Sequence, residues 1–133
     1  MSRKKPFPSE HAEQVEFMYL LATHLPEIYA HTTAIPNGGK RHLSVAKKLK
    51  AEGVKKGYPD LLIDLPRGRY HGARFEMKRQ YSRPSKTTKE QLEWLERLNA
   101  AGYYAMVVKG AVHAFEQAAK YYSFGEFNGK YSG

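Results

Sequence analysis

Two carboxylates and a lysine lie close together in the middle of the chain, where polar and apolar residues alternate. Asp60 follows a proline at the start of one alternating segment, and Glu76 and Lys78 stand two residues apart in the next. Successive strand side chains point to opposite faces, so Glu76 and Lys78 share one face. Carboxylate oxygens suit a hard divalent cation, Mg²⁺ or Mn²⁺, which also binds substrate phosphates. A neighbouring lysine can orient water and offset charge on a phosphate, so these residue types indicate phosphodiester hydrolysis.

The two segments are predicted to form an antiparallel hairpin. Residues 60–64 and 73–78 alternate with period two, and residues 65–69 supply turn residues between them. A hairpin would bring Asp60, Glu76 and Lys78 onto one polar surface. The pattern is weak by itself, because average residue usage produces Pro-Asp followed by acid-x-Lys in roughly one chain of this size in twenty. Other parts of the chain must therefore support the interpretation.

The length and composition limit the class of protein. A chain of 133 residues suits one domain, so we expect a single unit over residues 1–133, with a core from about 9 to 122 and a frayed tail over 123–133. The absence of cysteine excludes disulfides, thiolate nucleophiles and cysteine-ligated zinc. No apolar run is long enough to cross a bilayer, and no hydrophobic signal segment follows the basic N-terminus. We therefore expect no membrane partner and a cytoplasmic location.

The chain is strongly basic, with a formal net charge of +9 and a pI near 9.7. Such a charge suggests a polyanionic partner, because each cation that neutralises a phosphate releases a counterion. A protein that is merely basic is the alternative. The positive residues flank the acidic hairpin, and those expected to contact nucleic acid are Lys40, Arg41, Lys47, Lys55, Lys56 and Arg79.

Hydrophobic periodicity and turn residues predict alternating helices and strands. Helices are expected at 9–24, at 44–51, between the residues 87–90 and Gly102, and at 112–122. Strands are expected at 28–35, 60–64, 73–78 and 103–109. This order is typical of an α/β layered domain around a mixed sheet.

Capping residues mark three of the predicted helix starts. Ser9 is expected to cap the first helix, which Pro26 ends, and Ser44 to cap the short helix. Thr87 and Glu90 satisfy the capping-box pattern for the third helix.

Acidic residues in the first predicted helix are further candidates for the site. Glu10, Glu13 and Gln14 are spaced i, i+3 and i+4, so they lie along one side of that helix. From the spacing alone, they can equally be ordinary acids that the positive end of the helix dipole favours.

Six short blocks, in order along residues 9–109, carry a resemblance to a known family. They are Glu10-His11-x-x-Gln14, Ile35-Pro36-Asn37-Gly38-Gly39, Leu49-Lys50-Ala51-Glu52-Gly53-Val54, Gly57-x-Pro59-Asp60, Phe75-Glu76-Met77-Lys78 and Thr88-x-x-Gln91-x-x-Trp94-Leu95. The chain thereby resembles the VRR-NUC branch of the PD-(D/E)xK nucleases, especially the small standalone members of phages and bacteria. The resemblance implies a restriction-endonuclease-like αβββαβ core, a mixed sheet flanked by helices.

The resemblance also implies roles for individual residues. The implied catalytic residues are Glu10, Asp60, Glu76, Lys78 and Gln91. Asp60, Glu76 and Glu10 would hold the metal, Lys78 would be the catalytic lysine, and Gln91 would face the site from a helix. Glu13 is the alternative to Glu10, and without the resemblance Gln91 would be a surface residue of a capped helix.

The function that follows is a Mg²⁺- or Mn²⁺-dependent DNA endonuclease. Standalone family members are associated with homodimers that resolve four-way (Holliday) junctions, which implies branched DNA as the substrate and a bacterial or phage-infected cell as the location. Flaps, nicks or linear duplex are alternative substrates. A catalytically inert DNA-binding protein with this fold is a second hypothesis, and a small-molecule phosphodiesterase is a third.

Overall fold

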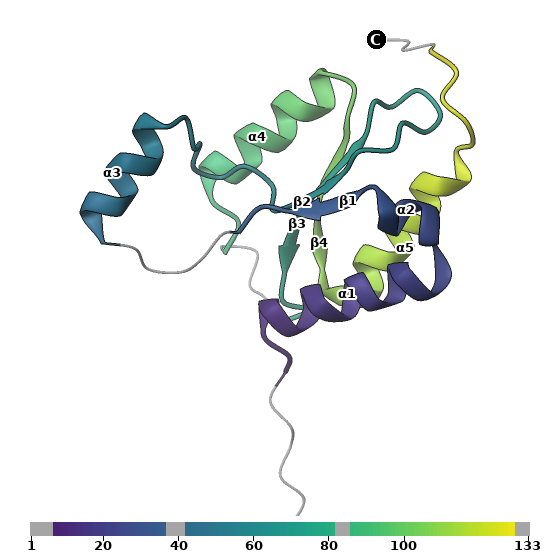
Figure 1. Cartoon of the computed structure of the whole chain (residues 1–133), viewed down its shortest axis with the longest axis horizontal. Helices are drawn as coiled ribbons and strands as arrows, with labels where there is room; N and C mark the ends of the chain where they lie inside the picture. Colours follow the sequence, from purple (N-terminus) through teal and green to yellow (C-terminus); the bar gives the residue numbers. More distant parts are fainter. Residues whose placement is uncertain (1–6, 37–41, 82–85, 130–133) are drawn as a thin grey trace, which may run out of the picture.

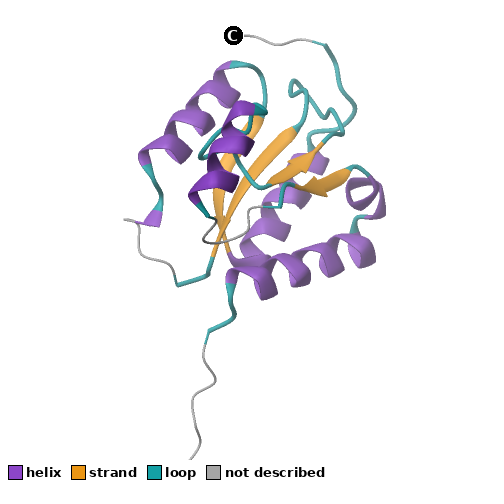
Figure 2. Cartoon of the chain, turned by 60° about the vertical axis from the view of Figure 1, so that its left-hand side comes forward, coloured by secondary structure: helices purple, strands orange, loops and turns teal. Residues whose placement is uncertain are grey.

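A computed structural model describes residues 7–36, 42–81 and 86–129, which form a mixed sheet with helices on both faces (Figures 1 and 2). Across the sheet, the strands of these residues are β1 (Thr32–Ala34), β2 (Leu61–Ile63), β3 (Ala73–Lys78) and β4 (Tyr104–Lys109). The pairs β1–β2 and β2–β3 are antiparallel, whereas β4 is parallel to β3. The predicted hairpin and the mixed sheet are therefore confirmed.

The helices are α1 (Glu10–His24), α2 (Pro26–Ala30), α3 (Leu43–Ala51), α4 (Lys89–Ala100) and α5 (Gly110–Ser123). α1 and α5 pack together on one face of the sheet. α4 covers the other face as the connection between the parallel strands β3 and β4. α3 lies apart from the other helices (Figure 1), and none of its residues is buried. The αβββαβ core expected from the resemblance is present, with α2 and α3 inserted and α5 added.

The main core lies between the sheet and the pair α1 and α5. Phe75 and Met77 of β3 are fully buried there with Phe17 and Leu21 of α1 and Tyr121 of α5. Each such side chain contributes about 1.5–3 kcal/mol through its removal from water. Because strand residues alternate, burying Phe75 and Met77 on this face turns the residues between and after them to the α4 face.

A smaller apolar cluster joins α4 to the other face of the sheet. Leu95 and Leu98 of α4 pack against Ala105 of β4. The ring of Trp94 meets that of Tyr58 edge to face, with ring centroids 5.0 Å apart. α4 therefore holds the segment that leads into Asp60.

The first half of the chain differs from the sequence prediction between residues 25 and 35. Pro26 follows the end of α1 as predicted, but it then begins α2, because proline fits the first turn of a helix. The strand expected over 28–35 is consequently wrong except for β1. α3 begins at Leu43 after His42, so Ser44 lies inside the helix and is not its cap.

The capping box of α4 lies one residue later than predicted. The Oγ1 atom of Thr88 accepts a hydrogen bond from Gln91 N, and the side-chain oxygen of Gln91 accepts one from Thr88 N. The predicted capping box of Thr87 and Glu90 is therefore wrong. Thr88 and Gln91 match the same sequence pattern one residue later, so the pattern alone does not distinguish the two pairs.

The tail was expected to be frayed from residue 123, and its described part is not. Ser123 ends α5, and the segment after it pairs with the turn between β2 and β3. Gly68 N donates to Gly125 O at 2.8 Å, and Asn128 N donates to Gly68 O at 3.0 Å. Within the described residues, no helix has the length and apolar character needed to span a membrane.

Candidate active site

The hairpin register brings Asp60 opposite Glu76. Leu61 pairs with Phe75, so the next residues outward, Asp60 and Glu76, face each other across the two strands. Asp60 Oδ1 accepts a hydrogen bond from Met77 N at 3.0 Å, and Asp60 O accepts one from Ile35 N at 2.8 Å. Asp60 is therefore fixed between β1 and β3 just before β2 begins.

The residues before Asp60 are held against α4. Gly57 has a φ of +87°, and a Cβ atom there would lie 2.7 Å from the backbone carbon of Glu90. Only glycine takes this conformation readily and allows so close an approach. Tyr58, next in the chain, contacts Trp94 and accepts a hydrogen bond from the buried guanidinium of Arg74 at 3.2 Å. The path of the chain into Asp60 thus depends on α4 and β3.

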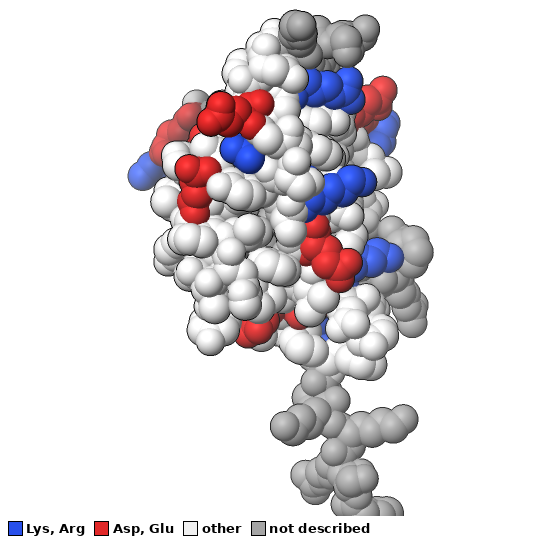
Figure 3. Space-filling model, turned by 90° about the vertical axis from the view of Figure 1, so that its right-hand side faces the viewer, with Lys and Arg blue, Asp and Glu red and all other residues white. Residues whose placement is uncertain are grey.

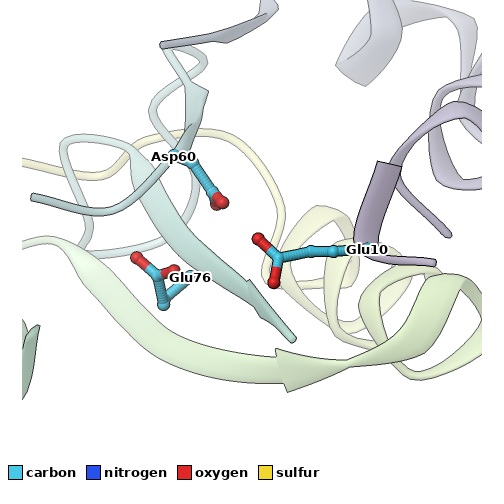
Figure 4. A group of neighbouring side chains, drawn as sticks. All are labelled: Glu10, Asp60 and Glu76. Atoms are coloured by element: carbon cyan, nitrogen blue, oxygen red, sulfur yellow. The ribbon is translucent and has the colours of Figure 1, made fainter. Parts of the chain in front are cut away.

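Three carboxylates converge at this point, as Figure 4 shows. Glu10 comes from the first residue of α1, Asp60 from the loop before β2, and Glu76 from β3. One oxygen of each lies within 4.8 Å of the others. Asp60 and Glu76 are 3% and 2% exposed, whereas Glu10 is exposed. The group is open to solvent on the Glu10 side.

Burial makes two of these carboxylates hard to ionise. Burial, the main cause, and then the charge of Asp60 raise the pKa of Glu76 to about 8, although the Lys78 ammonium acts in the opposite direction. Burial is also the main cause that raises the pKa of Asp60 to about 6, while the hydrogen bond from Met77 N lowers it. A cation placed among the three groups would offset the cost of burying their negative charge and would reduce their mutual repulsion.

Glu76 also has an unsatisfied oxygen. Its Oε1 atom is buried, and no hydrogen-bond partner for it exists among the described residues. Such orphaned atoms are rare in folded proteins. The donor set consists of oxygens alone, which fits a hard divalent cation such as Mg²⁺ or Mn²⁺.

Lys78 follows Glu76 on the same face of β3. Its Nζ atom lies 3.8 Å from Glu76 Oε2 and donates a hydrogen bond to Lys86 O at 3.3 Å. Lys78 is buried, and β3 extends past its pairing with β2 from Glu76 to Lys78. The lysine thus stands where the two strands have separated, beside the carboxylates.

Glu10, and not Glu13, is the helix residue that joins Asp60 and Glu76. Glu13 is 7% exposed and its carboxylate accepts hydrogen bonds from Gln80 N at 3.2 Å and from Ala111 N at 3.4 Å. It therefore caps the first turn of α5 across the fold. Sequence spacing had left both acids possible, since it cannot show which backbone donors lie nearby.

Gln91 lies on α4 at its N-terminal turn. Its side-chain oxygen closes the capping box with Thr88 N, and its backbone nitrogen would lie 2.8 Å from a Cβ atom on Gly57. The residue is therefore close to the segment that leads into Asp60. Its side-chain oxygen has the local role that the sequence alone favoured.

Of the basic residues expected to contact nucleic acid, the four that the structure describes come from three separate parts of the chain: α3, the segment before Asp60 and the end of β3. Lys40 and Arg41 lie outside the described residues; Lys47 is exposed on α3. Lys55 and Lys56 line a cleft of about 430 Å³ beside α4, and Lys56 lies 3.9 Å from the carboxylate of Glu90.

Arg79 is the sixth of these residues, and its guanidinium donates to two backbone carbonyls, Pro8 O and Phe7 O. Positive and negative side chains are interspersed on the face of the molecule shown in Figure 3.

A cleft of about 560 Å³ opens beside Glu10 and Asp60. Its remaining lining comes from α1, from the last residue of β1 and from the two residues after it, namely His11, Gln14, Ala34, Ile35 and Pro36. Apart from Ala34, these residues belong to two of the six blocks that resemble the VRR-NUC family, although no individual role was predicted for them. Gln14 follows Glu10 at position i+4, on the same side of the helix, and this spacing predicted that the two lie close together.

One of three comparisons with known proteins identifies the family of the chain. A solved structure described as a VRR_NUC domain protein superposes on this chain with a TM-score of 0.81. The match covers 94% of this chain and 97% of the other, at 31% sequence identity. No family model matches the sequence, and no curated protein matches it. At this identity and coverage, the structural match shows that the chain belongs to the VRR-NUC domain family.

Proposed function

We propose that this chain is a divalent-metal-dependent DNA endonuclease that hydrolyses phosphodiester bonds. The observation that carries the proposal is the meeting of Glu10, Asp60 and Glu76 within 4.8 Å, with the ammonium of Lys78 beside them. Membership of the VRR-NUC family supports nuclease activity as the general class. The net charge of +9 supports a nucleic acid as the partner.

The metal would be held by Glu10, Asp60 and Glu76. When bound, Mg²⁺ or Mn²⁺ supplies Lewis-acid chemistry, polarising the phosphodiester and promoting the ionisation of water. The unsatisfied oxygen of Glu76 and the raised pKa values of Glu76 and Asp60 support such an occupant. Oxygen ligands disfavour a soft metal.

Lys78 would position the attacking water and stabilise negative charge on the phosphate. Its ammonium is buried and already held near the carboxylates by Lys86 O, so little reorganisation is needed. Gln91 would act from the start of α4, as the family resemblance implies, through its amide nitrogen, because its oxygen caps the helix.

The cleft beside Glu10 and Asp60 would take the nucleotide next to the scissile phosphate. It offers the polar side chains of His11 and Gln14 on one wall and the apolar Ile35 and Pro36 on the other. That combination suits a base, which has both an apolar face and polar edges.

A four-way junction is the substrate that we propose within this class, cut by a homodimer. The support is the resemblance to standalone family members, since two sites related by a twofold axis can cut two strands. Flaps, nicks and linear duplex are the competing substrates.

The test is cleavage of a labelled four-way junction and a sequence-matched linear duplex with Mg²⁺, Mn²⁺ or EDTA. We expect metal-dependent, paired symmetric nicks in the junction, produced by a species of twice the chain mass. Asp60→Ala and Lys78→Ala should each reduce cutting by on the order of 10²-fold or more while leaving DNA binding in EDTA intact. Binding without cutting in every metal would contradict the proposal and favour an inert DNA-binding protein. Cutting of duplex and junction at equal rates would contradict only the junction preference.

A further inference from the structure

The residues immediately after Lys78 contact the segment that leads into α1. Arg79 Nε donates a hydrogen bond to Pro8 O, and Arg79 Nη2 donates one to Phe7 O, both at 3.0 Å. The rings of Tyr81 and Phe7 lie with centroids 3.7 Å apart. One end of the strand that carries Glu76 therefore binds the backbone just before Glu10.

A second set of contacts holds α1 one turn after Glu10. The carboxylate of Glu13 accepts hydrogen bonds from Gln80 N and from Ala111 N in the first turn of α5. A Cβ atom on Gly110 would lie 2.6 Å from Glu13 Oε2, and Gly110 has a φ of +85°. A larger residue at this position would displace the Glu13 carboxylate, so glycine leaves room for the hydrogen bonds that connect α1 to α5.

Glu10 itself has little else to fix it. It is the first residue of α1, after the cap Ser9, whose Oγ accepts a hydrogen bond from Ala12 N at 3.0 Å. It is exposed, unlike Asp60 and Glu76. Helix ends fray, and ordering a flexible backbone has an entropic cost that would reduce metal affinity.

We propose that Arg79 is a positioning residue for the metal site, fixing the Phe7–Ser9 backbone so that Glu10 meets Asp60 and Glu76. This role differs from the nucleic-acid contact that the sequence suggested for Arg79, and it rests on the two hydrogen bonds that the guanidinium donates to backbone carbonyls of the same chain. The inference rests on the proposed function in one respect, that the three carboxylates bind a divalent cation.

The experiment is a Mn²⁺ titration of the full chain without DNA, followed by calorimetry or electron paramagnetic resonance. The variants are Arg79→Ala, Glu10→Gln and the double variant. The control is Arg97→Ala, which removes an exposed arginine on α4 that contacts Glu93 and Trp94. Melting temperatures in EDTA verify that each variant is folded.

Arg79→Ala should weaken Mn²⁺ binding about tenfold, the size of effect usual for residues that orient metal ligands. In the Glu10→Gln background the same change should alter the affinity less than about twofold, because the ligand that Arg79 positions is already gone. A general loss of stability would instead weaken both backgrounds equally. Arg97→Ala should leave Mn²⁺ affinity unchanged.

Three results would overturn the proposal. Unchanged Mn²⁺ affinity in Arg79→Ala would show that Arg79 does not position Glu10. Equal losses of Mn²⁺ affinity in the unaltered and Glu10→Gln backgrounds would show that Arg79 does not act through Glu10. Lower DNA affinity in EDTA, together with normal Mn²⁺ binding, would show that Arg79 contacts a phosphate instead. In each case, Mn²⁺ binding by the unaltered chain leaves the proposed function standing. If the unaltered chain does not bind Mn²⁺, the metal site itself is refuted.

Discussion

Ionisation of the buried Glu76 carboxyl lowers the stability of the folded protein. Its pKa is raised to about 8 from an ordinary value of 4.5, mainly by burial. Between these two pH values, the folded protein holds a proton that the unfolded chain releases. The stability of the metal-free protein therefore falls as pH rises from about 4.5 to 8. Asp60, with its pKa raised from 3.8 to about 6, adds to this fall at lower pH.

Replacing Glu76 by glutamine tests this linkage. In EDTA at pH 8, Glu76→Gln should melt at a higher temperature than the unaltered protein, because no buried carboxyl needs to ionise. At pH 4 the two should melt alike, since Glu76 is then protonated. Thermal unfolding followed by circular dichroism at both pH values measures the difference, with the more exposed Glu93→Gln as a control. A lower melting temperature for Glu76→Gln at pH 8 would contradict the assigned pKa.

Substitution of Lys78 should reduce cleavage much more than it reduces metal binding. Lys78→Ala should reduce cleavage by on the order of 10²-fold or more, since it removes the positive charge beside the phosphate. Mn²⁺ affinity should change by less than about tenfold, because all three oxygen ligands remain. Lys109→Ala is the matched control, since Lys109 is exposed and is the register partner of Lys78 on β4. Equal losses of binding and cleavage would make Lys78 a structural residue.

At the level of elements, the path of the chain into Asp60 depends on contact with α4. Gly57 and Gly53 both have positive φ angles, +87° and +99°. A Cβ atom on Gly57 would collide with the backbone of Glu90 and Gln91, whereas one on Gly53 would meet nothing within 4 Å. The two glycines therefore differ only in their surroundings.

This pair offers a matched test. Gly53→Ala should lower the free energy of unfolding by about 1 kcal/mol through backbone strain alone. Gly57→Ala should lower it by about 2 kcal/mol or more, because the α4 backbone must also shift. Only Gly57→Ala should weaken Mn²⁺ binding, since it displaces Asp60. Urea unfolding and Mn²⁺ titration check both effects, and equal effects of the two substitutions would contradict the role of α4.

Local patterns predicted the hairpin well and the contacts between distant elements poorly. Period-two alternation placed Glu76 and Lys78 together because the sheet buries Phe75 and Met77 on its other face. The two capping boxes of α4 overlap in sequence, so only the structure distinguishes Thr88 from Thr87. Pro26 fits both the end of one helix and the start of another.

Residues whose partners are remote could not be assigned from the sequence. Glu13 meets Ala111, and Arg79 meets Phe7, at separations that no local pattern encodes. Family resemblance, rather than spacing, favoured Glu10 over Glu13. The structure supports that choice through the position of each carboxylate.

For the whole molecule, the excess of positive charge should govern DNA binding. In EDTA, the logarithm of DNA affinity should fall linearly with the logarithm of salt concentration. If Lys55 and Lys56 contact phosphates, the double alanine variant should reduce that slope by about 1.8, or about 0.9 for each contact. Lys120→Ala, an exposed lysine on α5, is the control. Fluorescence anisotropy measures the slopes, and an unchanged slope would remove this pair from the interface.

We expect the carboxylates that the fold gathers to bind a divalent metal, and the protein to cleave DNA only with that metal bound. The most direct test of this expectation is the rate at which labelled DNA is cut at pH 8 by the unaltered protein and by Glu76→Gln, each with Mn²⁺ or with EDTA. We predict that the unaltered protein cuts DNA with Mn²⁺ and does not cut it with EDTA. Glu76→Gln, although more heat-stable in EDTA, should cut more slowly by on the order of 10²-fold or more. Undiminished cutting by Glu76→Gln, or cutting by the unaltered protein in EDTA, would contradict metal-dependent cleavage at this site.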